Sequence, residues 1–253
     1  MSETDDTTPE PDPRLPLAPL DDARLARALT LQQIGKGVVD DLPTADEYEP
    51  IEGALQMVRL AEKLAEQAVI IRREQGASWT DIGKEAGISR QAAHDRWGTA
   101  VETWVALGRH RQAAPDLLVD QLDSWYADID PERPDAISSG LPSLHDPAAR
   151  RAAQDQRDEA QRLHAELNTY PEQESDAFNR AFQATGTPEH PARRREWAAV
   201  HLEHAALLDR LAQVEPLAAT EHRRRARTQR SLADEIAAKA TDRTTTTENE
   251  PAA

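Results

Sequence analysis

The sequence predicts an all-α protein, and three observations support this fold class. Hydrophobic residues make up 38% of the 253 residues and aromatic residues only 4%, whereas charged residues reach 30%. A core built from Leu, Ala and Val suits thin helical layers better than a β-sandwich or barrel, which needs more β-branched and aromatic residues. Apolar residues also recur at spacings of three and four, the helical period, along much of the chain.

The composition also indicates the compartment. Cysteine is absent, which excludes disulfides and thiolate metal sites and fits a reducing compartment. The acidic, proline-rich start has no apolar signal segment, and the apolar cluster at 68–71 ends at two arginines. Arginine is abundant and lysine occurs only four times, which indicates a GC-rich bacterial genome. We therefore expect a cytoplasmic bacterial protein with no membrane segment.

The N-terminal part is expected to be a tail followed by a helix. Residues 1–20 hold five prolines and many acids, a composition typical of a disordered tail. A helix is expected from Asp21, where Asp21 or Asp22 would cap it. Apolar residues then follow at near-helical spacing from Leu25 to Leu42.

A second helix is expected over 51–75, after a turn-rich connector at 43–50. Gly76 would end it. We expect it to pack across the two short helices that follow. Its predicted buried stripe is Ile51, Ala54, Leu55, Val58, Leu64, Ala65, Ala68 and Ile71.

The stretch 78–97, SWTDIGKEAGISRQAAHDRW, predicts two short helices joined by a tight turn. Ser78 and Asp81 form a capping-box pattern at the start of the first helix. Gly87 is placed to end that helix in a left-handed conformation, and Ser89 would cap the second helix. The predicted inner faces consist of Ile82, Gly83 and Ala86, and of Ala92, Ala93 and Trp97. The predicted outer face of the second helix consists of Arg90, Gln91, His94 and Arg96.

This stretch resembles the helix-turn-helix of sigma-70 factor region 4 and related bacterial regulators. The shared features are a small residue at Gly83, a turn glycine at Gly87 followed by an apolar residue, Ser89, and an arginine at Arg96 followed by a bulky apolar residue. The resemblance covers about twenty residues. It implies a helical domain that places its second helix in the DNA major groove.

Two residues depart from the family pattern. Ala93 stands where the family has a branched apolar residue, and Asp95 places an acid on the helix that would approach phosphates. An ordinary hairpin of two structural helices is therefore the alternative interpretation of this stretch.

Specific DNA contacts follow if the helix over 89–97 enters the major groove. Arg90 would bond guanine and Gln91 adenine, while His94 and Arg96 would contact a further base or the opposite backbone. Arg72 and Arg73 have the alternative role of a solvated helix end. Phosphate contacts are expected from Ser78, Thr80, Ser89, Arg72 and Arg73.

The charge distribution argues against indiscriminate nucleic-acid binding. The net charge is −16, with −8 in residues 1–50 and −7 in residues 113–146. Residues 51–112, which contain the motif, carry +1. Because acidic flanks repel DNA, binding would depend on a few directed contacts.

The chain after the motif leaves one structural question open and predicts a linker. Thr99 and Glu102 would start a new helix as a capping box, or the second helix of the motif continues. Residues 113–146 are expected to form a short helix and then an acidic, Pro-rich linker, with a domain boundary near 130–146. The acids lack the Gly and terminal Glu of a calcium loop. The predicted organisation is a DNA-binding domain at 21–112, this linker, a helical C-terminal region at 147–240 and a disordered tail at 241–253.

The C-terminal region should contain a long helix from Pro191 to about Glu215, with Pro216 interrupting it. A basic run at 222–230 would be a phosphate-contacting arm or a solvated face. The partner of the long helix is either another helix of this chain or the same helix of a second subunit, which would make a homodimer. The coiled-coil seam that requires this partner is Trp197, Val200, His204, Leu207, Leu211, Val214 and Ala218.

No catalytic motif is recognisable, and no cofactor is expected. His201 and His204 would share one helix face, but no HExxH pattern supplies a third metal ligand, so His204 is expected to be a polar core residue. No phosphate loop or GxSxG is present. The sequence therefore predicts a sequence-specific DNA-binding protein, a bacterial transcriptional regulator. The alternative is a helical protein–protein interaction or scaffold protein that does not bind DNA.

Overall fold

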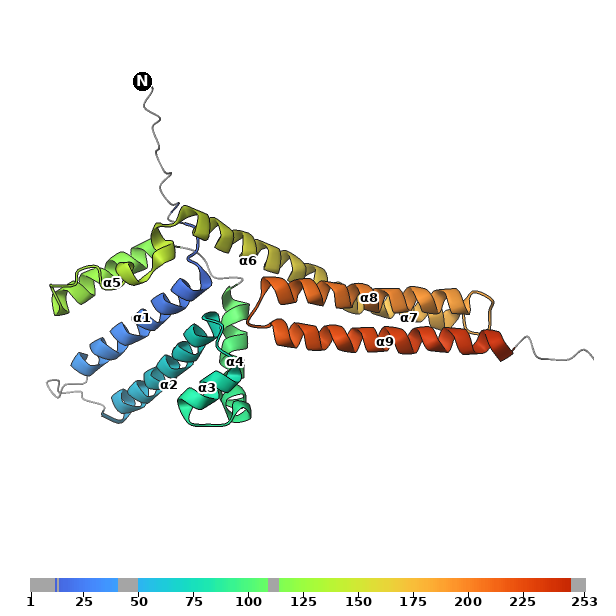
Figure 1. Cartoon of the computed structure of the whole chain (residues 1–253), viewed down its shortest axis with the longest axis horizontal. Helices are drawn as coiled ribbons and strands as arrows, with labels where there is room; N and C mark the ends of the chain where they lie inside the picture. Colours follow the sequence, from blue (N-terminus) through green and yellow to red (C-terminus); the bar gives the residue numbers. More distant parts are fainter. Residues whose placement is uncertain (1–11, 13, 41–49, 109–113, 247–253) are drawn as a thin grey trace, which may run out of the picture. The chain divides into compact units, whose positions relative to one another are not determined.

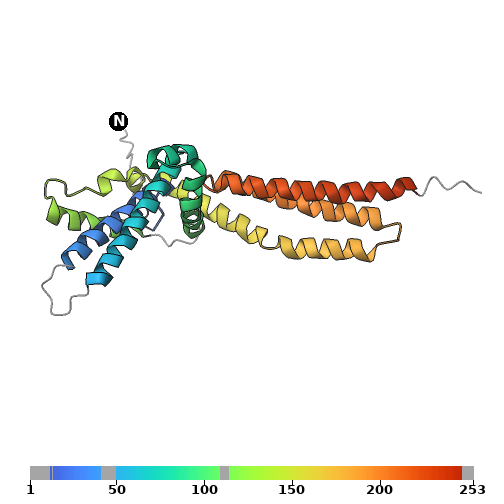
Figure 2. The same cartoon turned by 90° about the horizontal axis from the view of Figure 1, so that it is seen from below.

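The computed structural model describes residues 12, 14–40, 50–108 and 114–246 (Figure 1, Figure 2). Within these residues every regular element is a helix, so the predicted all-α class is confirmed. None of the described helices is both long and apolar enough to cross a membrane. The chain divides into two compact units: unit 1, Met1–Arg157, and unit 2, Asp158–Ala253.

Unit 1 is a layer of helices in which α1 lies between α2 and α5 (Figure 1). The helix α4 packs against both α2 and α3. The elements of unit 1 are α1 (Pro19–Asp40), α2 (Pro50–Glu74), α3 (Trp79–Ala86), α4 (Arg90–Gly108), α5 (Pro115–Ile129), the short 3-10 helices η1 (Ser138–Gly140) and η2 (Pro142–His145), and the first part of α6 (Pro147–Leu167).

The ordered part of the chain begins closer to the N-terminus than the sequence indicated. Leu17 is 1% exposed and packs in a core cluster with Leu25 and Leu122, so the prediction of a disordered tail is wrong for residues 14–20. The rest of that predicted tail, residues 1–11 and 13, lies outside the described residues. The helix α1 begins at Pro19, before the predicted cap.

Asp21 has a structural task other than capping α1. Its Oδ2 accepts hydrogen bonds from the backbone N of Ser143 at 2.7 Å and from its hydroxyl at 2.6 Å. Asp21 is 4% exposed, and its Oδ1 also accepts a bond from Arg24. The carboxylate therefore fixes η2 against the start of α1.

The acidic segment predicted to be a linker is instead packed into unit 1. Its prolines and acidic residues lie at the ends of short helices and in the connections between them. The leucines of α5 and η2 pack in the core beside α1. The carboxylate of Asp123 accepts hydrogen bonds from the backbone N of Ile137 at 2.7 Å and of Ser138 at 3.3 Å. The predicted boundary near 130–146 therefore falls inside a compact unit, and the division lies within α6.

The helix α2 buries a different face from the predicted one. Leu60, Gln67 and Ile70 are buried toward α1 and α4, whereas Ile51 and Leu55 are 75% and 52% exposed. The apolar pattern did not reveal this face because it includes a glutamine. The side-chain amide of Gln67 donates to the backbone oxygen of Ala26 at 3.0 Å, which satisfies a polar group in the core. The connector 43–50 lies almost wholly outside the described residues.

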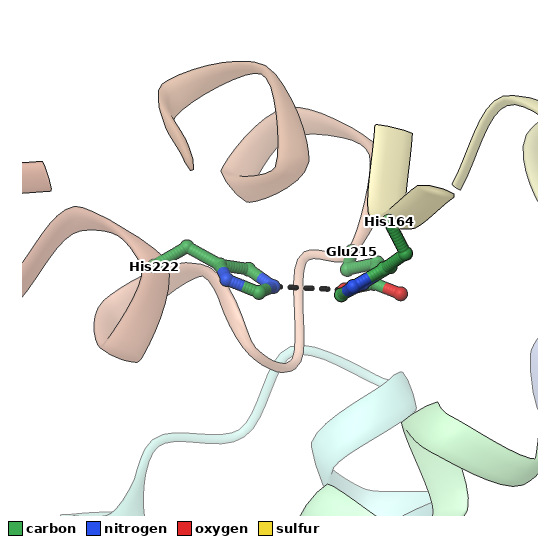
Figure 3. A group of neighbouring side chains, drawn as sticks. All are labelled: His164, Glu215 and His222. Carbon is green, nitrogen blue, oxygen red and sulfur yellow. Dashed lines mark hydrogen bonds and ion pairs between the residues drawn. The ribbon is translucent and has the colours of Figure 1, made fainter. Parts of the chain in front are cut away.

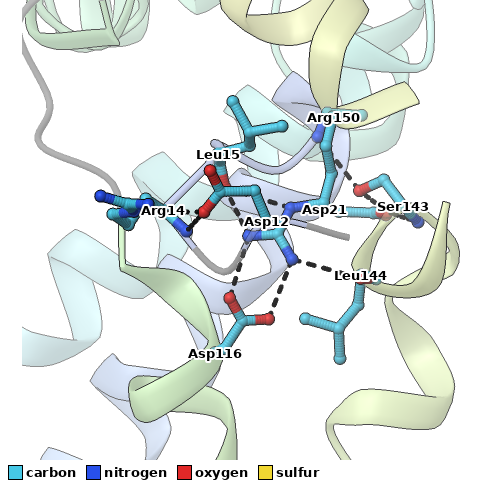
Figure 4. Close-up of polar contacts among 9 residues, drawn as sticks. Asp12, Arg14, Leu15, Asp21, Asp116, Ser143, Leu144 and Arg150 are labelled. Atoms are coloured by element: carbon cyan, nitrogen blue, oxygen red, sulfur yellow. Dashed lines mark hydrogen bonds and ion pairs between the residues drawn. The ribbon is translucent and has the colours of Figure 1, made fainter. Parts of the chain in front are cut away.

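One buried arginine joins several segments of unit 1 (Figure 4). The side chain of Arg150, in α6, has no exposed surface. Its two terminal nitrogens each donate to a different carboxylate oxygen of Asp116 at 2.9 Å. It also donates to the backbone oxygens of Leu15, at 3.1 Å from Nε, and Leu144, at 3.3 Å. The chain start, α5 and η2 are thereby held to α6.

Unit 2 is built from the end of α6 and three further helices, with α8 packed along α9 and α7 (Figure 2). Pro216 separates α8 from α9, as predicted. The helix α9 continues beyond the predicted start of the C-terminal tail at residue 241, and residues 247–253 lie outside the described residues. The three helices are α7 (Tyr170–Gln183), α8 (His190–Val214) and α9 (Ala219–Thr246).

The seam of α8 is covered by this chain's own helices. Leu207 and Leu211 are 2% and 0% exposed and share a cluster with Leu163 of α6 and Ala226 of α9. Of the two partners that the sequence left open, the structure contains the intramolecular one. The apolar contacts of Leu207 and Leu211 are thus made within the chain, and they give the predicted homodimer through residues 197–214 no support.

Replacing Arg150 by Leu is expected to destabilise unit 1 by about 3 kcal/mol, because a carboxylate and two carbonyl oxygens lose their donor. Urea unfolding followed by tryptophan fluorescence, in a Trp197→Phe background that leaves only the tryptophans of unit 1, measures this loss. The neighbouring Arg151 is exposed. Arg151→Leu is therefore the matched control, expected within about 0.5 kcal/mol of the parent. Equal midpoints for the two variants would contradict the assignment.

Candidate functional site

The two helices α3 and α4 meet through a tightly specified turn. Ser78 Oγ accepts a hydrogen bond from the backbone N of Asp81 at 3.2 Å, and the Asp81 carboxylate accepts one from the backbone N of Ser78 at 2.9 Å. Gly87 has φ +70°, the left-handed conformation that favours glycine. Ser89 Oγ accepts from the backbone N of Ala92 at 3.1 Å and so caps α4. These local predictions are confirmed.

Gly83 allows α3 to approach the turn closely. A Cβ atom at this position would lie 2.9 Å from the backbone oxygen of Ile88 and 3.1 Å from that of Ser89. Ile82 and Gly83 are buried in α3. Ala93 and Trp97 are buried in α4, as predicted, but Ala86 and Ala92 are exposed. The buried inner face of the two helices therefore contains fewer residues than the sequence indicated.

The helix α4 continues past the motif without interruption to Gly108, so the new helix at Thr99 does not form. Its later part is joined to α2. The indole Nε1 of Trp104 donates to Oε1 of Glu74 at 3.1 Å. The expected packing of α2 is therefore found against α4.

The four predicted base-contacting residues are all exposed on the first turns of α4. The side-chain amide of Gln91 donates to Asp95 at 2.7 Å. His94 packs its ring edge-on against Trp79, with ring centroids 5.2 Å apart, and the guanidinium of Arg96 lies 5.2 Å above the ring of Trp97. Arg90 is exposed, and its side chain makes no hydrogen bond or ion pair with the described residues. Three of the four side chains are thus oriented by neighbours within the motif.

The two arginines at the end of α2 contact the chain itself. Arg72 donates to both carboxylate oxygens of Glu85 in α3, at 3.1 and 2.5 Å, and this hydrogen bonding raises the pKa of Arg72. Arg73 donates to the backbone oxygen of Ala77 at 2.7 Å and lies over the ring of Trp79 at 5.2 Å. Burial lowers the pKa of Arg73. Arg73 thus joins the end of α2 to the start of α3, and Arg72 joins it to the end of α3, a role that neither interpretation of the sequence included.

Ser78, Thr80 and Ser89, which were predicted to contact phosphates, are exposed at the ends of their helices. Trp79 was not among the predicted site residues of this region. It stands at the first position of α3, between His94 and Arg73. An aromatic residue at the first position of a short helix is the signal that would have drawn attention to it.

The histidine pair of α8 lies in the core of unit 2. Nδ1 of His204 is 2.7 Å from Oε1 of Glu174, and Nδ1 of His201 is 2.6 Å from Oε1 of Gln229. The ring of Tyr170 stacks on His204 with centroids 4.8 Å apart. The prediction that His204 is a polar core residue is confirmed by its 7% exposure.

The exposed polar face of α4 and the helix ends beside it form the candidate functional site. No family model matches the chain, and neither curated proteins nor solved structures give a match.

Replacing Gly83 by Ala is expected to destabilise unit 1 by about 1–3 kcal/mol, because the added methyl group meets the backbone of the turn. Gly98→Ala is the matched control. Gly98 also lies in a helix, but the atoms nearest to a Cβ there belong to the exposed ring of His94, the closest at 3.4 Å. The control is expected to be neutral or more stable by up to about 1 kcal/mol. Unfolding by urea, followed by fluorescence, distinguishes them. A gain of stability in both variants would contradict the close approach of α3 to the backbone of the turn.

Glu74→Gln is expected to raise the melting temperature of unit 1 at pH 7. Burial raises the pKa of Glu74 above its ordinary value of 4.5, and the Trp104 hydrogen bond only partly opposes this. The folded state therefore binds the proton more tightly than the unfolded state, so ionisation costs stability as the pH rises above 4.5. Glutamine keeps an acceptor for Trp104 without the charge.

The gain should disappear at about pH 3.5, where the carboxyl is neutral in both states. Thermal unfolding of both proteins at the two pH values, followed by fluorescence, checks this. Glu62→Gln, on an exposed part of α2, is the matched control and should leave the melting temperature unchanged. A gain for Glu74→Gln that persists at low pH would show that charge burial is not its cause.

Proposed function

We propose that unit 1 binds double-stranded DNA sequence-specifically, as part of a bacterial transcriptional regulator, with the first turns of α4 in the major groove. One observation carries the proposal: α3 and α4 are capped helices joined by the left-handed Gly87, with a buried inner face and an exposed polar outer face. Helix-turn-helix domains present the N-terminal residues of their second helix to base edges in this way.

Arg90 is the residue best placed for base recognition. It is exposed on the first turn of α4 and makes no hydrogen bond or ion pair with the described residues. A free guanidinium can donate two hydrogen bonds to O6 and N7 of guanine. Gln91 would exchange its hydrogen bond to Asp95 for one to adenine. Because an existing hydrogen bond is lost, its contribution to the binding free energy is smaller than that of Arg90.

The arrangement supports weak nonspecific affinity. Arg72 bonds Glu85 and Arg73 bonds the backbone of Ala77, so neither guanidinium is free for phosphates. Asp95 also places a negative charge on α4. Few phosphate contacts release few counterions, and the dependence of affinity on salt should therefore be shallow. Specificity would come from α4 more than from general electrostatic attraction.

A protein-binding role is the alternative, and one observation favours it. Ile51, Leu55 and Val58 lie at spacings of four and three along α2, and each is more than half exposed. An exposed apolar stripe of this kind is typical of a surface that binds another helix. In that case α3 and α4 would be an ordinary structural hairpin, and exchanging the charges on α4 would leave function unchanged.

The test is retention of fragmented genomic DNA by the full chain, followed by sequencing of the retained fragments. A common enriched site is expected. Arg90→Ala should weaken binding to that site by about 1–3 kcal/mol and relax its sequence preference. Arg27→Ala removes the same charge from an exposed position of α1 and should bind like the parent. Absence of an enriched site, or equal binding by the two variants, would contradict the proposal and leave the protein-binding alternative.

A further inference from the structure

Unit 2 contains a compact group of two histidines and one glutamate (Figure 3). Oε2 of Glu215 lies 3.0 Å from Nε2 of His164 and 2.8 Å from Nε2 of His222. Glu215 and His222 are each 5% exposed, and His164 is partly buried. One ligand-type atom from each residue lies within 4.8 Å of the other two.

Three separate elements bring these side chains together. His164 is in the last turn of α6, Glu215 is the C-terminal cap of α8, and His222 is in the first turn of α9. Pro216 stops α8 directly after the glutamate, and the backbone N of Glu215 still donates to Leu211 at 2.8 Å. The backbone at this corner is therefore held independently of the three side chains.

The ring of His222 makes its hydrogen bond through Nε2 and lies with its centroid 6.0 Å from that of His164. Its Nδ1 is buried and has no hydrogen-bond partner among the residues that the structure describes. The orientation of this ring is consequently set by what Nε2 contacts, which is the carboxylate that Nε2 of His164 also contacts. The Nε2 atoms of both imidazoles thus approach the same carboxylate oxygen, Oε2 of Glu215.

This set of atoms has the composition of a zinc site. Bonds of about 2.0–2.2 Å to tetrahedral zinc separate neighbouring ligand atoms by about 3.4 Å, so small side-chain rotations would admit the ion. Two imidazole nitrogens and one carboxylate oxygen favour a borderline ion such as Zn²⁺ over Ca²⁺ or Mg²⁺, which take mainly oxygen ligands.

We propose that His164, Glu215 and His222 bind one Zn²⁺ ion through both Nε2 atoms and the glutamate carboxylate, with water as the fourth ligand. The ion would fasten the corner between α8 and α9 to the end of α6 and so stabilise unit 2. Three protein ligands and one water also occur in catalytic zinc sites, but the burial of two ligands assigns this ion a structural role. The proposal is independent of DNA binding by unit 1.

Metal titration of the full chain tests the proposal. After EDTA treatment and its removal, calorimetry with ZnCl₂ should give one ion per chain with a dissociation constant of about 1 μM or below. The melting temperature followed by the fluorescence of Trp197, the tryptophan of unit 2, in a background with the other four replaced by Phe, should rise with zinc. Co²⁺ bound instead should show visible absorption bands typical of tetrahedral coordination.

The variants separate this site from incidental imidazole binding. His222→Ala and Glu215→Gln should each weaken zinc binding by about 100-fold, because a direct ligand is lost. His145→Ala removes an exposed histidine of η2 and should bind like the parent. Circular dichroism checks that each variant is folded, and the near-isosteric Glu215→Gln keeps the test valid if the alanine variant unfolds. Absence of stoichiometric binding by the parent, or parental affinity in Glu215→Gln, would overturn the proposal.

Discussion

The folding of unit 1 depends on a guanidinium that has lost all contact with solvent. Arg150 bonds the carboxylate of Asp116 and the backbone oxygens of Leu15 and Leu144, which belong to segments that are far apart in the sequence. A thin core of leucine and alanine offers these segments little apolar surface to share. A charge-assisted network supplies geometric definition instead, because each donor of the planar guanidinium fixes one acceptor.

The sequence predicted the fold best where the determining interactions are local. The Ser78 cap, the left-handed Gly87 and the Ser89 cap each depend on residues within a few positions, and all are present. The buried face of α2 was predicted wrongly, because the apolar stripe beginning at Ile51 suggested one side and the packing selected another. Gln67 is buried there only because a carbonyl 41 residues away accepts its hydrogen bond, which no local pattern reveals.

The same distinction applies to the candidate sites. Exposure of the outer face of α4 followed from helical periodicity, but the bond between Arg72 and Glu85 depends on the path of the turn between α2 and α3. The three side chains of the proposed zinc site are even harder to predict from the sequence. His164 and Glu215 are 51 residues apart, and neither has a neighbour at metal-ligand spacing within its own helix. Composition alone excluded thiolate sites but not sites made of imidazole and carboxylate.

The uninterrupted course of α4 has a mechanical consequence. Its 19 residues form a rod about 28 Å long, whose first turns carry the exposed polar face and whose later turns are fastened to Glu74 through Trp104. Because α4 is continuous, a tilt at its Trp104 end, beside the partly buried Glu74, would move Arg90 through an arc. Loss of the contact between Trp104 and Glu74 would therefore change the direction in which the first turn of α4 points.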